Sequence, residues 1–218
     1  MQNILQVKIC GLTNLDDIDL ALGLGADYAG IIVYPKSPRS VTLDSAFNLL
    51  PNIPVGKRVV VDVKPDATRL ESYKEAGFDY FQIHTGSRID LSLIQEWSEV
   101  VGADRLWLAP KVDPKASFPT KVLSFAKTIL IDTFSLSEEG GTGRTGDWDN
   151  FKRLQNEYPS SDWILAGGLS PENVTRAIES SKARFIDVNS GVEAEPGIKS
   201  ATKLQKLFAC LDRSKTIV

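Results

Sequence analysis

Three features of this sequence predict an α/β protein, a single (β/α)8 TIM barrel that spans residues 1–218 as one domain. Strand-like apolar runs alternate with helical periods almost throughout, which is typical of a parallel sheet covered by helices. Eight strand-like runs can be counted along the chain. The last two each lead into a glycine-rich loop, and barrels of this class commonly bind phosphate after strands seven and eight.

The first half of the chain predicts four strand–helix units. Asn14 precedes Leu15, Ile18 and Leu22, which recur at helical spacing, so Asn14 is the expected N-cap of the first helix. Three consecutive valines at 59–61 suit a strand that is buried on both faces. The strands are expected at 5–9, 28–34, 58–63 and 80–83, and the helices from residue 14 and at 42–50, 66–76 and 91–101.

The second half contains one irregular connection. Pro110, Pro114 and Pro119 interrupt the segment after the fifth strand, so the fifth helix is expected to be short, irregular or absent. A long loop at 134–146 follows the sixth strand. The strands of this half are expected at 106–108, 129–131, 163–166 and 185–188, and the helices at 148–157, 171–180 and 199–211.

Composition limits the classes of partner. With 42% apolar residues and a net charge of -3, the chain predicts one globular domain without a basic stripe for nucleic acid, so we expect a small-molecule partner. The absence of any apolar run of about 18 residues argues against a membrane span, and residues 1–3 lead directly into a strand, so we expect a cytoplasmic location. Cys10 and Cys210 lie far apart without a CxxC spacing, which predicts neither a disulfide framework nor a metal site. The sequence leaves monomer and homodimer open.

Two glycine-rich loops predict the phosphate site. Gly167 and Gly168 follow the seventh strand, and Ser190 and Gly191 follow the eighth. Backbone N–H groups that are exposed in such loops bind anions, and a following helix directs more of them at the anion. Ser170 is the expected N-cap of the helix after the first loop.

Catalytic side chains in such barrels come from the carboxyl ends of the strands. Cys10 follows the first strand and Asp132 follows the sixth. A thiol and a carboxyl group at these positions suit a base and an acid that face one pocket. A small buried hydrophobe at Cys10 and a loop-capping carboxylate at Asp132 are the alternatives.

Two further strand ends carry polar groups. Arg39 lies in a turn stiffened by Pro35 and Pro38, which favours an inward guanidinium that contacts a carboxylate, although a solvated surface arginine is equally compatible. His84 is the single histidine and follows the fourth strand. We interpret it as a hydrogen-bonded wall of the pocket rather than as a catalytic group.

The loop after the sixth strand is rich in glycine, including Gly141 and Gly143. It lacks the lysine of a nucleotide-binding GxxxxGK[ST] motif. We therefore interpret it as a flap that closes over the substrate, with an ordinary surface loop as the alternative.

Taken together, six motifs resemble the phosphoribosylanthranilate isomerase family of tryptophan biosynthesis. They occur in order along essentially the whole chain, as KICGLT, PKSPRS, QIH, IDT with GGTG, LAGGLSPENV and DVNSGVEAEPGIK. The resemblance implies an Amadori rearrangement of N-(5-phosphoribosyl)anthranilate, with no cofactor and no metal. The chain departs from the family pattern at Thr85, Gly146, Asn189 and Ser200. None of these changes touches Cys10, Arg39 or Asp132.

The resemblance also implies roles for individual residues. Asp132 would protonate the ring oxygen and the Cys10 thiolate would remove the C2 proton, so the carboxyl should stay protonated while the thiol ionises near neutral pH. Arg39 would bind the anthranilate carboxylate. The other implied substrate contacts are His84, Gly141 and Gly143, and the implied phosphate contacts are Gly167, Gly168, Ser190 and Gly191.

Three other functions are alternatives to the isomerase function that the resemblance implies. The related histidine-pathway isomerase resembles this fold but uses an aspartate where this chain has Cys10. Indole-glycerol-phosphate synthase relies on a lysine and a glutamate at strand ends, and no matching pair is visible. A silent phosphate-binding barrel would need neither an acid nor a base, so Cys10 and Asp132 argue against it.

Overall fold

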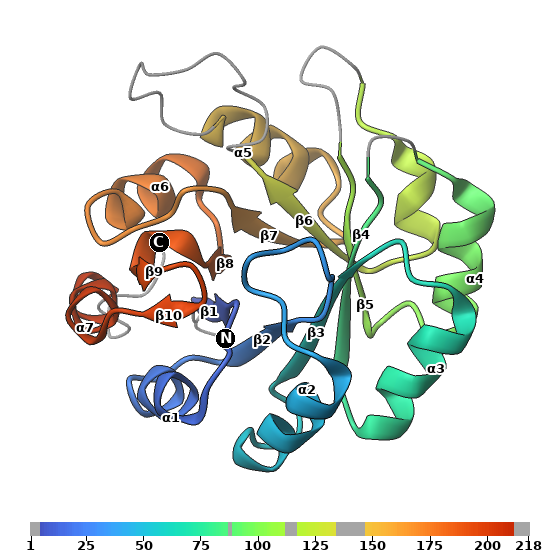
Figure 1. Cartoon of the computed structure of the whole chain (residues 1–218). Helices are drawn as coiled ribbons and strands as arrows, with labels where there is room; N and C mark the ends of the chain where they lie inside the picture. The colour runs from blue at the N-terminus through green and yellow to red at the C-terminus, as the bar shows by residue number, and fades with distance from the viewer. Residues whose placement is uncertain (1–4, 87–88, 112–116, 134–146, 212–218) are drawn as a thin grey trace.

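The computed structural model describes residues 5–86, 89–111, 117–133 and 147–211 of the chain. Eight parallel strands form a closed barrel in chain order, and β1 completes it by pairing with both β2 and β8 (Figure 1). The expected (β/α)8 barrel is therefore confirmed. The strands are β1 (Gln6–Cys10), β2 (Tyr28–Ile32), β3 (Arg58–Val63), β4 (Tyr80–His84), β5 (Leu106–Ala109), β6 (Thr128–Asp132), β7 (Asp162–Ala166) and β8 (Phe185–Val188).

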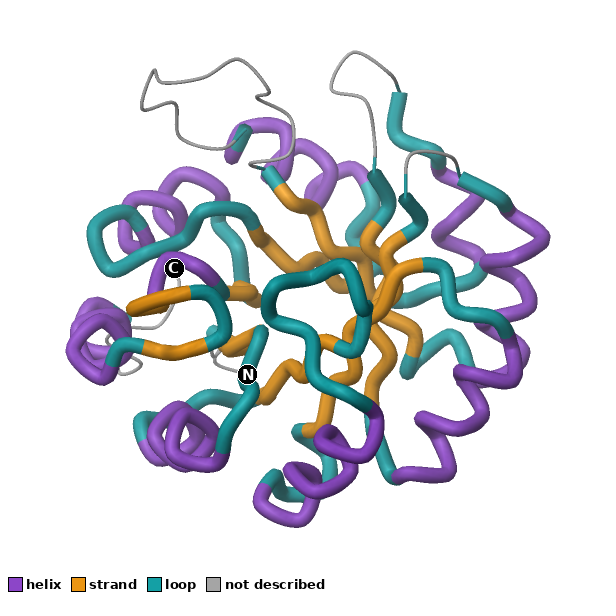
Figure 2. Tube along the Cα trace, viewed as in Figure 1, coloured by secondary structure: helices purple, strands orange, loops and turns teal. Residues whose placement is uncertain are grey.

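Helices surround the strands as an outer ring (Figure 2). Asn14 caps α1 as expected, because its side chain accepts a hydrogen bond from the backbone N–H of Asp17. The fifth helix is replaced by a short 3-10 turn, η2 (Thr120–Ser124), directly after Pro119. The α-helices are α1 (Leu15–Gly23), α2 (Leu43–Leu49), α3 (Ala67–Ala76), α4 (Leu91–Val101), α5 (Trp148–Glu157), α6 (Val174–Ser181) and α7 (Ala201–Cys210), and the other 3-10 turns are η1 (Leu50–Asn52) and η3 (Ser190–Val192).

The start of α6 corrects a sequence prediction. Ser170 is not its N-cap, and the helix begins at Val174. The Asn173 side chain folds back, accepting from the Ser170 N–H at 2.9 Å and donating to the Gly168 carbonyl at 2.8 Å. These bonds compete with helical geometry and keep the residues between the first glycine-rich loop and the helix in a turn.

The start of α7 also differs from the prediction. Lys199, the expected first residue of this helix, is instead the last residue of a small antiparallel hairpin, β9 (Glu193–Glu195) with β10 (Ile198–Lys199). Gly197 provides the left-handed backbone of the turn, with φ 87°. Ser200 then caps α7 by accepting from the Lys203 N–H. The hairpin places Glu193 and Lys199 beside the mouth of the barrel.

The barrel interior is built in layers. Alternation along β3 directs Val60 to the outer core and Val59 and Val61 to the interior, which confirms burial on both faces. At the amino-terminal end four aromatic rings pack with centroids 4.8–5.4 Å apart, namely Tyr28, Tyr80, Trp107 and Phe185. This apolar layer closes the bottom of the barrel, so polar chemistry is confined to the carboxyl ends of the strands.

Candidate active site

One cavity of about 250 Å³ collects most of the residues that the sequence singled out. Its lining belongs to segments far apart in the chain, and it lies at the carboxyl ends of the strands. The predicted site residues in the lining are Cys10, Arg39, His84, Asp132, Gly167, Gly168 and Ser190. A neighbouring cavity of about 360 Å³ shares Val61, His84, Leu130 and Asp132 with the first, so the two compartments adjoin.

Cys10 and Asp132 end β1 and β6 and reach this cavity from different sides of the barrel. Cys10 is buried, whereas Asp132 is exposed. Burial raises the pKa of the Cys10 thiol, and the nearby ammonium group of Lys8 opposes this only in part. The expectation that this thiol ionises near neutral pH is therefore not met in the structure without substrate. In this structure the protonated thiol is the favoured form.

The two glycine-rich loops meet at the other end of the cavity. Gly167 and Gly168 have φ angles of 101° and 60°, a left-handed conformation that glycine adopts without steric cost. A Cβ on Gly191 would lie 2.0 Å from the Leu169 carbonyl oxygen, so only glycine lets the second loop approach the first this closely. Within the described residues, the backbone N–H groups of Gly168, Ser190 and Gly191 donate no hydrogen bond. Such N–H groups can bind an anion.

Arg39 reaches the mouth of the cavity but is held by a carboxylate. Its Nε and Nη2 donate to Glu193 at 2.8 to 3.0 Å, and Lys199 Nζ donates to the same carboxylate at 3.1 Å. Hydrogen bonding to Glu193 raises the pKa of Arg39. Gly11 makes room for this arrangement, because a Cβ there would lie 3.0 Å from Arg39 Cδ and 2.7 Å from Asn189 Oδ1. The guanidinium is thus oriented before any ligand arrives.

His84 forms part of the wall between the two cavities. Burial, followed by the charge of Lys8, lowers the pKa of its imidazole, so the neutral form prevails at pH 7. Its Nε2 lies 3.2 Å from Gln82 Nε2, a contact in which the amide can donate to the neutral ring. The buried Gln82 Oε1 has no partner within the described residues.

Comparison with known proteins assigns the family. Residues 7–209 match the family model described as N-(5'phosphoribosyl)anthranilate (PRA) isomerase. This chain belongs to the PRA isomerase family. The N-(5'-phosphoribosyl)anthranilate isomerase of Aquifex aeolicus is 38% identical over 93% of this chain and 96% of its own length.

Solved structures of PRA isomerases are similar to this chain along almost its whole length. A monomeric form of the dimeric Thermotoga maritima enzyme has a TM-score of 0.76 and 29% identity, covering 95% of this chain and 98% of its own. A PRA isomerase in complex with reduced 1-(o-carboxyphenylamino)-1-deoxyribulose 5-phosphate has a TM-score of 0.75 and 27% identity, with the same two coverages. The barrel thus follows the PRA isomerase fold.

Some buried charged groups around the cavity were not predicted from the sequence. Lys8, Asp187, Glu193 and Lys199 are buried charged groups near the cavity, and none was singled out. Two signals were available: a lysine inside an apolar strand, two residues before Cys10, and a carboxylate two residues after Gly191. Gly141 and Gly143, the expected flap contacts, lie outside the described residues.

Among the described helices, none is long and apolar enough to span a membrane.

Proposed function

We propose that this chain catalyses the isomerisation of N-(5'-phosphoribosyl)anthranilate to 1-(2-carboxyphenylamino)-1-deoxyribulose 5-phosphate in tryptophan biosynthesis. The observation that carries the proposal is that Cys10, Asp132 and both glycine loops line or adjoin one cavity in a member of this family. An acid, a base and an anion site around one cavity suit a phosphorylated sugar whose ring opens and which then isomerises by proton transfers.

In this proposal the phosphate binds the backbone N–H groups of Gly167, Gly168, Ser190 and Gly191. The left-handed backbone at the first two glycines and the close approach of Gly191 to Leu169 support this assignment. Backbone donors at a fixed loop bind phosphate without requiring a basic side chain. This agrees with a chain whose overall charge is acidic.

The acid–base steps follow from the two strand ends. Asp132, in its protonated form, gives its proton to the ring oxygen as the C1–O bond breaks, and the nitrogen lone pair forms the C1=N bond of an iminium. Cys10, as the thiolate, then takes the proton from C2, and that C–H electron pair forms the enolamine. Finally the C2 hydroxyl loses its proton and C1 gains one, which yields the ketone. The thiolate is the minor form of Cys10 before the substrate reacts, because burial raises the pKa of the thiol. The free energy of deprotonating Cys10 therefore adds to the activation barrier.

Arg39 is proposed to bind the anthranilate carboxylate. Its guanidinium already faces the cavity, and its Nη1 is not used in the bonds to Glu193. Binding the carboxylate at one end and the phosphate at the other would hold the sugar between Asp132 and Cys10. We place His84 and the flap residues Gly141 and Gly143 among the substrate contacts, without a proton-transfer role.

The cellular setting is also part of the proposal. A biosynthetic enzyme with a phosphorylated small-molecule substrate suits the cytoplasm. We expect no nucleic-acid partner, because the chain carries a net charge of -3. Monomer and homodimer are both compatible with the barrel, and a sedimentation measurement would separate them.

The direct test incubates the purified protein with N-(5'-phosphoribosyl)anthranilate and identifies the product by mass spectrometry and chromatography. We expect conversion to the ribulose phosphate and growth of a tryptophan auxotroph that lacks this step. Activity only with the histidine-pathway ribosylamine would assign the chain to the rival isomerase. Tight binding of a product analogue without turnover or complementation would indicate a silent barrel.

A further inference from the structure

An ion pair lies inside the barrel beneath the thiol. Lys8 and Cys10 are two residues apart on β1, so their side chains share the interior face. Asp187 is the register partner of Lys8 on β8, and Lys8 Nζ lies 2.9 Å from Asp187 Oδ1. The side chain of Lys8 is fully buried and that of Asp187 is 8% exposed. Burying a lysine ammonium costs free energy unless a counter-charge is paired with it, so Lys8 depends on Asp187 to remain charged inside the barrel.

The neighbouring strand is shaped around this ammonium group. Gly30 on β2 is the register partner of Cys10. A Cβ at Gly30 would lie 2.8 Å from Lys8 Cε and 2.9 Å from Lys8 Nζ. The end of the Lys8 side chain therefore occupies the space that a side chain at position 30 would fill. The ammonium group of Lys8 lies close enough to the thiol to lower the pKa of Cys10.

We propose that Lys8 is a positioning residue whose buried ammonium group stabilises the thiolate of Cys10, while Asp187 holds that ammonium beneath the sulfur. This inference rests on the proposed role of Cys10 as the base. When Cys10 loses its proton, the negative charge forms beside a cation that is already fixed. The cation need not be recruited from solvent, which is the advantage of a preorganised site.

Electrostatics agrees with this geometry. Burial lowers the pKa of Lys8, but Asp187 and then Cys10 outweigh it, so the shift is upward and the ammonium stays charged. For Cys10, burial raises the pKa, Lys8 lowers it and Asp187 raises it by less than Lys8 lowers it. The other charged or titratable groups near Cys10 are Lys199 from β10, Arg39 from the loop after β2, His84 from β4 and Asp132 from β6.

The test measures the thiolate without using the substrate. Cys210 is the second of two cysteines and is exposed, so Cys210→Ser leaves Cys10 as the only thiol. In this parent, the rate of Cys10 alkylation by iodoacetamide is followed from pH 7 to pH 10 by mass spectrometry. We expect Lys8→Met to slow alkylation at pH 8 by about tenfold, which corresponds to a pKa rise of about one unit. Asp187→Asn should also slow it, because without the carboxylate burial lowers the pKa of Lys8 and the side chain is no longer held as an ammonium group.

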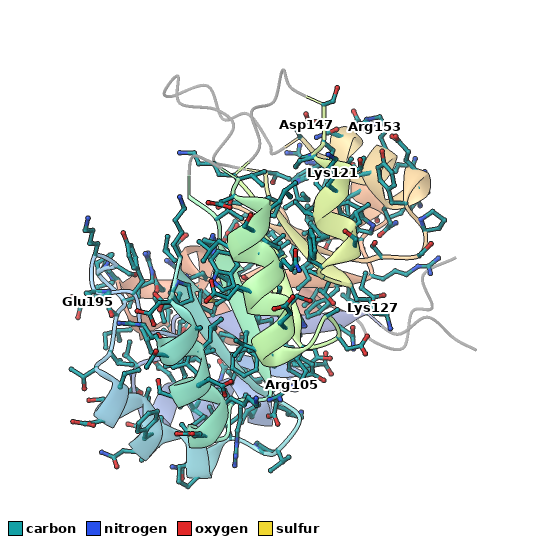
Figure 3. The ribbon with its side chains drawn as sticks, turned by 90° about the vertical axis from the view of Figure 1, so that its right-hand side faces the viewer. Arg105, Lys121, Lys127, Asp147, Arg153 and Glu195 are labelled. Carbon is teal, nitrogen blue, oxygen red and sulfur yellow. The ribbon has the colours of Figure 1, made fainter. Side chains whose placement is uncertain are left out.

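A double variant guards against misfolding. Lys8→Met alone leaves the Asp187 carboxylate unpaired, whereas Lys8→Met with Asp187→Asn removes both charges. We expect the double variant to melt cooperatively and still to alkylate more slowly than the parent. Lys127→Met is the matched control for a lost lysine, since Lys127 is exposed and lies far from Glu195 at the barrel mouth (Figure 3). It should alkylate at the parent rate.

Two outcomes are decisive. A folded double variant with the parent's alkylation profile would overturn the role of Lys8. If the double variant alkylates slowly but the parent protein has no isomerase activity, Lys8 still stabilises the thiolate. In that case the proposed function is wrong and the role of Lys8 stands. In an active protein, the same variant should lose turnover at least as strongly as alkylation, with little change in KM.

Discussion

Glu193 holds the guanidinium of Arg39 through both of its carboxylate oxygens, with Nε and Nη2 donating at 2.8 to 3.0 Å. The same carboxylate accepts from Lys199, and its side chain is only 5% exposed. Two cations and one anion therefore share a small volume at the mouth of the cavity. The surplus positive charge would attract a substrate carboxylate, while the bidentate contact fixes the plane of the guanidinium.

Replacing Glu193 should therefore impair binding more than chemistry. In Glu193→Gln, Arg39 loses its ionic partner and repels Lys199 without compensation. We expect KM for the phosphoribosylanthranilate to rise about tenfold, the scale of one charged hydrogen bond, while kcat changes by less than about threefold. Glu195→Gln is the matched control, because this exposed glutamate lies two residues further along the same hairpin strand. An unchanged KM in Glu193→Gln would remove its positioning role.

The same carboxylate should make stability sensitive to acid. Burial raises the pKa of Glu193, but the hydrogen bond from Arg39 and the charge of Lys199 outweigh it, so the net shift is downward. A group whose pKa is lowered by folding stabilises the protein above its unfolded value, about 4.3 for glutamate. This stabilisation is lost as the pH falls through the lower, folded value.

Thermal melts should show this loss directly. Between about pH 5 and pH 3, we expect Tm of the parent to fall more steeply than Tm of Glu193→Gln, because the glutamine has no proton to bind. The Glu195→Gln control should follow the parent. Parallel slopes for the parent and Glu193→Gln would show that the carboxylate does not titrate differently on folding.

Gly191 should be essential for the contact between the two glycine-rich loops. An alanine Cβ would meet the Leu169 carbonyl oxygen at 2.0 Å, and backbone atoms cannot yield as a flexible side chain can. We expect Gly191→Ala to lower the free energy of unfolding by about 1–3 kcal/mol and to raise KM at least tenfold.

A second glycine provides the comparison for that variant. Gly23 ends α1 and has no atom within 4 Å of its hypothetical Cβ, so Gly23→Ala should leave KM unchanged. Its stability should change by no more than about 1 kcal/mol, the difference in helix propensity between the two residues. Equal behaviour of the two alanine variants would argue against a built contact between the loops.

Cys10 and Asp132 should affect turnover without a matching effect on affinity. We expect Cys10→Ala and Asp132→Asn each to lower kcat by about 10² to 10⁴, the range attributed to a positioned acid or base. Binding of a product analogue, measured by calorimetry, should stay within a few-fold of the parent. Near-normal turnover in either variant would remove the role proposed for that residue.

Local patterns in the sequence predicted most of the fold. The order of strands and helices, the Asn14 cap, the missing fifth helix and the two glycine loops follow from period, capping residues and proline positions. The errors occurred where side chains compete with the backbone. Asn173 delays α6, and the hairpin around Gly197 delays α7, because each makes bonds that no local periodicity reveals.

Alternation and glycine placement are local properties of the chain, and they suffice to predict the barrel and the side chains at the ends of its strands. How these side chains act on one another depends on long-range contacts that no local pattern contains. Closing β1 against β8 pairs Lys8 with Asp187 across a sequence separation of 179 residues and sets this pair beneath Cys10. The charge around the thiol depends on that closure, since Coulomb interactions depend on distance in space and not along the chain.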